Sequence, residues 1–97
     1  MFYINVWLTV KNPEDIPRIG ELLTESARLS RPEPGCERFD VYHSEGDPKK
    51  FLLCEHWENK KAWEIHKEAE AFTTIYQPKV LPLVDREPHF SELISAS

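Results

Sequence analysis

The residues best suited to chemistry in this 97-residue chain are polar side chains that lie among apolar ones. His66 is the first of them. On a helix its neighbours at three and four positions are mostly apolar: Ala62, Trp63, Ala69 and, at the edge, Glu70. The imidazole is therefore expected to point towards the core, where it is suited to act as a general acid or base near neutrality. A buried histidine that only bonds a backbone carbonyl fits the same pattern, and burial alone does not choose between the two.

Asn5 and Glu55 lie inside apolar runs typical of strands. Both faces of the run around Asn5 are largely apolar. A buried amide needs hydrogen-bond partners, so Asn5 either orients a substrate oxygen or ties down a neighbouring strand. Glu55 interrupts the run 51–57 and needs a partner too, because an unpaired carboxylate is costly to bury. Arg38 is the candidate, which makes Glu55 either half of a structural ion pair or a catalytic group.

Large aromatic side chains are spread through the same segments. They fit core packing, and they equally fit the walls of a pocket for a flat aromatic ligand. The residues concerned are Trp7, Trp57, Trp63, Tyr42 and Tyr76.

No cofactor motif and no metal-ligand spacing is present along the chain. Three glycines make a phosphate-binding loop implausible. The four histidines show no clustering along the chain, except that a hairpin could bring His43 and His56 together. Cys36 and Cys54 are too few for a disulfide scaffold and are expected to be reduced. We therefore predict neither a metal nor a prosthetic group.

Composition excludes several classes of partner. The net charge of −5, with basic residues scattered among acidic ones, argues against nucleic acid. No stretch approaches about twenty apolar residues, so no membrane span is expected. The start of the chain has no basic region before its apolar residues, so a cytoplasmic location is expected. The length fits a single domain over residues 1–97, with a frayed end at 95–97.

The elements that must position these residues follow from periodicity. Strands are expected at 2–10, 36–44, 51–58 and 86–94, with helices after Asn12 and after Asn59, each of which is a plausible cap. Pro78 and Pro82 are expected to interrupt the apolar stripe after the second helix. The order strand–helix–strand–strand–helix–strand predicts a ferredoxin-like α+β fold.

Two finer features follow from this arrangement. Turn formers at residues 45–48 predict a hairpin, and if Ser44 and Phe51 flank the turn, Cys54 pairs with Val41 and Arg38 shares a face with Glu55. The expected helices cover one face of the sheet only, while the first strand is apolar on both faces. A second copy of the same sheet is the simplest cover, so a homodimer is expected.

Several segments together resemble the antibiotic biosynthesis monooxygenase domain, a family of dimeric α/β barrels. They are Arg31-Pro32-Glu33-Pro34-Gly35-Cys36, Arg38-Phe39-Asp40-Val41, Asp47-Pro48, the strand with Glu55 and Trp57, and Ala62 with His66. The resemblance covers nearly the whole chain. It implies a pocket between the sheet and the helices of each protomer. Several relatives oxidise phenols, anthrones or quinols with O2 and use no flavin, haem or metal.

The resemblance also implies roles and alternatives. Haem-degrading relatives share Asn5 but carry Trp and His where this chain has His66 and Tyr76, which disfavours haem degradation. An isomerase of a phosphorylated diketone shares the segment 38–41, and a non-catalytic ligand-binding module has the same barrel. The leading reading is a cofactor-independent monooxygenase on a small aromatic or quinol compound, with His66 as base and Asn5 as orienting amide. Glu55 is a further catalytic candidate, and the pocket walls are Trp57, Trp7, Tyr42, Tyr76 and Arg38.

Overall fold

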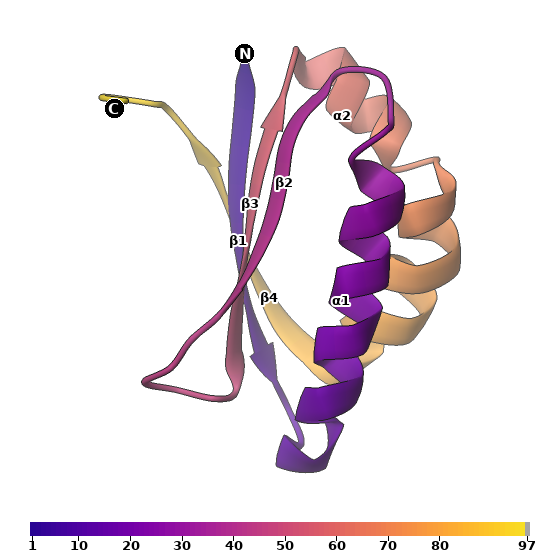
Figure 1. Ribbon diagram of the computed structural model, residues 1–97, viewed down its shortest axis with the longest axis vertical. Helices are drawn as coiled ribbons and strands as arrows, with labels where there is room; N and C mark the ends of the chain where they lie inside the picture. The colour runs from indigo at the N-terminus through magenta and orange to yellow at the C-terminus, as the bar shows by residue number, and fades with distance from the viewer. Residues whose placement is uncertain (97) are drawn as a thin grey trace.

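The computed structural model describes residues 1–96 and consists of a four-stranded antiparallel sheet with helices packed on one face (Figure 1). Its elements are β1 (Phe2–Val10), the 3-10 helix η1 (Pro13–Asp15), α1 (Ile16–Ser30), β2 (Cys36–His43), β3 (Lys50–Trp57), α2 (Lys60–His66), the π-helix η2 (Ala71–Val80), the 3-10 helix η3 (Leu81–Leu83) and β4 (Val84–Ser91). The strand order is β2-β3-β1-β4, and every neighbouring pair is antiparallel. This is the predicted ferredoxin-like α+β fold.

The two faces of the sheet differ sharply. On the inner face, alternate β1 side chains from Ile4 to Val10 are almost fully buried against the helices. The opposite face, called the open face below, has no helix over it, and its β1 residue Trp7 is 37% exposed. The expectation that both faces of this strand are buried therefore holds for one face only within the single chain.

Both asparagines that the sequence indicates as caps begin a helical segment: Asn12 caps η1, which leads into α1, and Asn59 caps α2. The Asn12 Oδ1 accepts a hydrogen bond from the Glu14 N–H at 3.1 Å, and the Asn59 Oδ1 accepts one from the Ala62 N–H at 2.8 Å. Both predicted caps are confirmed. None of the helices within residues 1–96 is long and apolar enough to cross a bilayer.

The end of the chain differs from the prediction. Pro78 does not interrupt the second helical stretch, because it lies inside the π-helix η2, which continues to Val80. Such π segments are uncommon and occur frequently at functional sites. The last strand, β4, begins at Val84 and ends at Ser91, earlier at both ends than the expected range 86–94. The frayed end expected for 95–97 lies partly outside the described residues.

The β2–β3 register is one residue away from the predicted one. His43 pairs with Phe51 and Asp40 with Cys54, and the ladder is irregular between Cys36 and Arg38. The prediction failed because Ser44 belongs to the turn: its Oγ accepts the Asp47 N–H at 3.1 Å. A one-residue slip moves side chains to the opposite face. Arg38 therefore shares no face with Glu55, and the proposed ion pair between them is wrong.

The loop between α1 and β2 is fixed by Gly35, which has a φ of +83°. A Cβ added there would lie 2.6 Å from the Ala62 Cβ on α2. The backbone conformation and the space both demand glycine.

We expect Gly35→Ala to lower the free energy of unfolding by about 1–3 kcal/mol, because the left-handed conformation strains any residue with a Cβ. Urea denaturation measures the change. Gly46→Ala is the matched control, since nothing lies within 4 Å of its added Cβ. Equal stability of the two variants would contradict the requirement for glycine at position 35.

Candidate active site

A small cavity lies between the inner face of the sheet and the helices. Its volume is about 10 Å³, which is room for about one water molecule. The residues that line it come from α1, β2, β3, α2, η2 and β4: Ser26, Phe39, Leu53, Glu55, Trp63, His66, Phe72, Tyr76 and Arg86. Phe72 and Arg86 are the lining residues that keep the most contact with solvent, whereas the others are buried. A ligand with an aromatic ring would have to displace side chains here.

His66, at the end of α2, is buried as predicted and lines this cavity. Three aromatic rings surround the imidazole at centroid distances of 4.6 Å for Trp57, 5.7 Å for Phe39 and 5.8 Å for Phe72. Its Nδ1 lies 2.8 Å from the Glu33 Oε1. The sequence analysis gives Glu33 only as part of a segment that carries the family resemblance, and it identifies no side-chain partner for His66.

Burial shifts the protonation of both members of this pair. It lowers the pKa of His66 to about 4 and raises the pKa of Glu33 to about 7. In each case the cause is loss of hydration, which disfavours the charged form. Near neutrality the imidazole is therefore neutral, with a free lone pair on one of its two nitrogens. A neutral imidazole beside a cavity can accept a proton.

Glu55 lies on the inner face of β3 and is 5% exposed. Its Oε1 accepts a hydrogen bond from the Trp57 Nε1–H at 3.0 Å. Burial is the main influence and raises the pKa of Glu55 to about 7, while the Trp57 bond and the Arg86 charge lower it and Glu33 raises it further. The carboxyl is therefore poised between its acid and its base form near neutrality.

Tyr76 and Arg86 form the remaining polar contact at the cavity. The Arg86 Nε–H donates to the Tyr76 hydroxyl at 3.1 Å. Burial raises the pKa of Tyr76, against the smaller opposing effect of the Arg86 charge. Arg86 was missed because the sequence places it at the edge of a strand, with no pattern that marks its direction.

The structure divides the predicted site residues into two groups. His66, Glu55 and Tyr76 line the cavity, and Trp57 packs against the His66 ring. The other four predicted residues, Asn5, Trp7, Tyr42 and Arg38, do not line it.

These four lie on other surfaces. The Asn5 Nδ2 donates to the Ser91 Oγ at 3.1 Å, which ties β1 to β4. Tyr42 is 53% exposed, and Arg38 is paired with Asp40 at 3.5 Å beside an open depression on β2. Strand alternation places Asn5 and Trp7 opposite the inward-pointing β1 residues, on the open face. The prediction that these four share a pocket with His66 is therefore wrong for the single chain.

The cysteines and the remaining histidines add no second site. Cys36 and Cys54 are free, and burial raises the pKa of the Cys36 thiol to about 11. His43 stacks on Phe51 at 4.2 Å, whereas His56 pairs with Arg38 at the other end of the hairpin, so the two do not approach each other. Within residues 1–96 no group of three or more His, Cys, Asp or Glu is arranged to hold a metal ion.

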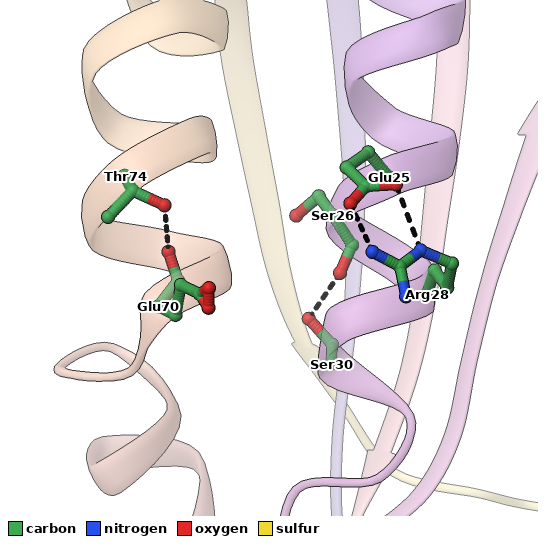
Figure 2. Close-up of polar contacts among 6 residues, drawn as sticks. All are labelled: Glu25, Ser26, Arg28, Ser30, Glu70 and Thr74. Carbon is green, nitrogen blue, oxygen red and sulfur yellow. Dashed lines mark hydrogen bonds and ion pairs between the residues drawn. The ribbon is translucent and has the colours of Figure 1, made fainter.

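Two buried serines on α1 were also missed. Ser26 lines the cavity, and the Ser30 hydroxyl donates to the Ser26 carbonyl at 2.7 Å. Figure 2 shows this bond beside the Glu25–Arg28 ion pair of the same helix, with the Thr74 hydroxyl bonded to the Glu70 carbonyl nearby. Hydroxyls satisfied within their own helix can be buried at little cost. The signal in the sequence was the spacing of Ser26 and Ser30 with the apolar stripe of Ile19, Leu23 and Ala27.

Comparison with known proteins gives one consistent family. Residues 1–77 match the family model described as antibiotic biosynthesis monooxygenase. A crystal structure called antibiotic biosynthesis monooxygenase is 25% identical with a TM-score of 0.88, and covers 98% of this chain and 100% of its own. A protein of Nitrosomonas europaea, provisionally given the same name, is 26% identical with a TM-score of 0.89 and the same coverage.

One curated relative is also similar in sequence. The uncharacterised protein YjcS of Bacillus subtilis (strain 168) is 32% identical over 66 residues. The match spans 68% of this chain and 63% of YjcS, so less than two thirds of that relative is covered.

Proposed function

Because the chain belongs to the antibiotic biosynthesis monooxygenase family, we propose that it is a cofactor-independent monooxygenase that oxidises a small phenolic or quinol compound with O2. The observation that carries the proposal is His66, a neutral imidazole buried among aromatic rings at a cavity between sheet and helices that brings together several polar groups. Relatives whose names include monooxygenase activity support the reaction type.

In the proposed oxidation, His66 acts as the base. Removal of a proton from a phenolic or activated C–H group gives an electron-rich anion that itself reduces O2. One oxygen atom enters the product and the other leaves as water, with the substrate supplying all the electrons. The protein then needs only to bind the substrate, exclude water and hold the proton. The rings of Trp57, Phe39 and Phe72 provide an apolar surface for a flat substrate.

The experiment is turnover of a simple quinol by purified protein under air and under argon, each with a protein-free blank. We expect product and matching O2 consumption only under air, with a blank visible spectrum and no stoichiometric metal by elemental analysis. Activity that requires added flavin or metal would contradict the proposal.

A second candidate is an isomerase. It is favoured by Glu55, whose carboxyl provides an acid at the same cavity as the His66 base. Proton transfer between two carbon positions uses such a pair. Turnover that is equal under argon and under air would select the isomerase. A non-catalytic ligand-binding module predicts no turnover in either atmosphere.

We further propose that a second copy of the chain covers the open face of the sheet. Trp7 and Tyr42 would otherwise stay exposed there, and burial of apolar area contributes about 25 cal/mol per Å². The cytoplasmic location stays a prediction.

Sedimentation is expected to give about twice the 11.4 kDa of the chain. Trp7→Lys, on the open face, should shift the protein to monomer. Ile65→Lys is the matched control, because Ile65 is exposed on α2, away from the open face. A wild-type monomer, or equal effects of the two variants, would contradict this interface.

A further inference from the structure

Glu33 is held at His66 by a clamped loop. The Glu33 N–H donates to the Ser30 carbonyl at 3.0 Å, and the Glu33 carbonyl accepts the Cys36 N–H at 3.1 Å. The Gly35 carbonyl accepts the Glu58 N–H at 2.7 Å, just before α2. The loop is thus bonded at both ends and also to the segment that leads into α2. This arrangement fixes the Glu33 carboxyl at 2.8 Å from the His66 Nδ1.

The imidazole is fixed from its other sides by the surrounding aromatic rings. With Nδ1 committed to Glu33, Nε2 is the nitrogen left for a ligand in the cavity that His66 lines. Which of the two nitrogens carries the proton depends on whether the partner oxygen accepts or donates. A carboxylate can only accept, whereas a carboxylic acid can donate.

Resting on the proposed role of His66 as base, we propose that Glu33 is a positioning residue that determines which His66 nitrogen carries the proton. As a carboxylate, Glu33 accepts from Nδ1–H and leaves the Nε2 lone pair free to take a proton from substrate. As a carboxylic acid, Glu33 donates to Nδ1, and the ring proton then sits on Nε2. The base is available in the first state and absent in the second.

The protonation of the pair gives this switch a pH range. Burial raises the pKa of Glu33 to about 7 and lowers that of His66 to about 4, so between these values the imidazole is neutral while Glu33 changes state. Other titratable or charged groups also face the pair or share its cavity and loop: Arg31 in the loop, Cys36 on β2, Glu55 on β3, Glu58 before α2, Tyr76 on η2 and Arg86 on β4. Burial raises the pKa of Glu55 to about 7 as well, so the switch is expected near neutrality and the Glu33→Gln variant is what assigns it to Glu33.

Nitrogen NMR of the full chain labelled with ¹⁵N-histidine tests the inference without any substrate. Long-range proton–nitrogen spectra distinguish a protonated from a bare ring nitrogen, and the His66 signals are those missing in His66→Gln. In the wild type we expect the proton on Nδ1 well above neutral pH and on Nε2 about two pH units lower, with a midpoint near the pKa of Glu33. In Glu33→Gln this transition should vanish, whereas the exposed Glu37→Gln control should keep it.

Any of three results overturns the inference. The first is a proton on Nε2 above neutral pH in the wild type, and the second is a wild-type tautomer that does not change with pH. The third is an unchanged transition in Glu33→Gln. If Glu33→Gln does not fold, the wild-type titration decides alone. The readout is independent of turnover, so a protein that never oxidises a quinol still tests Glu33. Conversely, if the enzyme is active but the same His66 nitrogen carries the proton at every pH, His66 remains the base and Glu33 does not control it.

Discussion

His66→Gln is expected to reduce kcat by about 10²–10⁴-fold while the protein keeps its fold, which is the usual range for loss of a general base. Glutamine retains a group that can bond the Glu33 carboxyl, so that carboxyl is not left unpaired. The experiment measures kcat and melting temperature on the same variant. His89→Gln is the matched control, because the His89 side chain is exposed and its imidazole bonds Glu87 rather than a residue of the cavity. Its kcat should be unchanged.

The pH dependence of kcat shows whether the His66 base is controlled by its own ionisation or by the ionisation of Glu33. The pKa of His66 is lowered to about 4, so control by the ring alone gives a rate that is flat above about pH 5. Control through Glu33 gives a rate that rises with pH through about 7. A folded His66→Gln with unchanged kcat would remove His66 from the mechanism and leave Glu55 and Tyr76 as the candidate bases.

Helical spacing was enough to place His66, because residues three and four positions apart share a face whatever the tertiary context. The same holds for the two caps, which depend on local hydrogen bonds. Its partner Glu33 could not be found this way, since a contact 33 positions apart in sequence depends on how the loop meets α2. The available signal was Gly35, whose left-handed backbone fixes that loop, but a single glycine does not identify its neighbours.

The error over the open face has a different cause. Strand periodicity tells which residues share a face but not which face meets the helices, and β1 is apolar on both. Trp7 and Asn5 were therefore grouped with the pocket although they point away from it. For β2 the error was in the register. The prediction placed Ser44 in the strand, whereas the structure has it in the turn, and this shift of one residue moves Arg38 to the opposite face from Glu55. Alternation within a strand is local information, whereas pairing between strands depends on turn geometry.

Glu55→Gln is expected to make the protein more stable than the wild type above neutral pH, by up to about 3 kcal/mol, and to leave it nearly equal below pH 4.5. The pKa of Glu55 is raised to about 7 in the folded state from an ordinary value of 4.5. Between these values the folded protein binds more protons than the unfolded chain, so the contribution of Glu55 to the free energy of unfolding falls as pH rises. Glutamine does not titrate, and its amide oxygen can still accept from the Trp57 Nε1–H.

Urea denaturation of the wild type and of Glu55→Gln across this pH range measures the difference between their free energies of unfolding. Because both proteins contain Glu33 and His66, the titration of these two residues cancels in the difference to first order. Glu37→Gln is the control, because its side chain is exposed to solvent. The sign of the slope is decisive. If Glu55→Gln loses stability relative to the wild type as pH rises, the Arg86 guanidinium outweighs burial and Glu55 is an ionised structural residue. If it gains stability, the carboxyl is kept protonated by burial near neutrality, which is the state that an acid at this cavity requires.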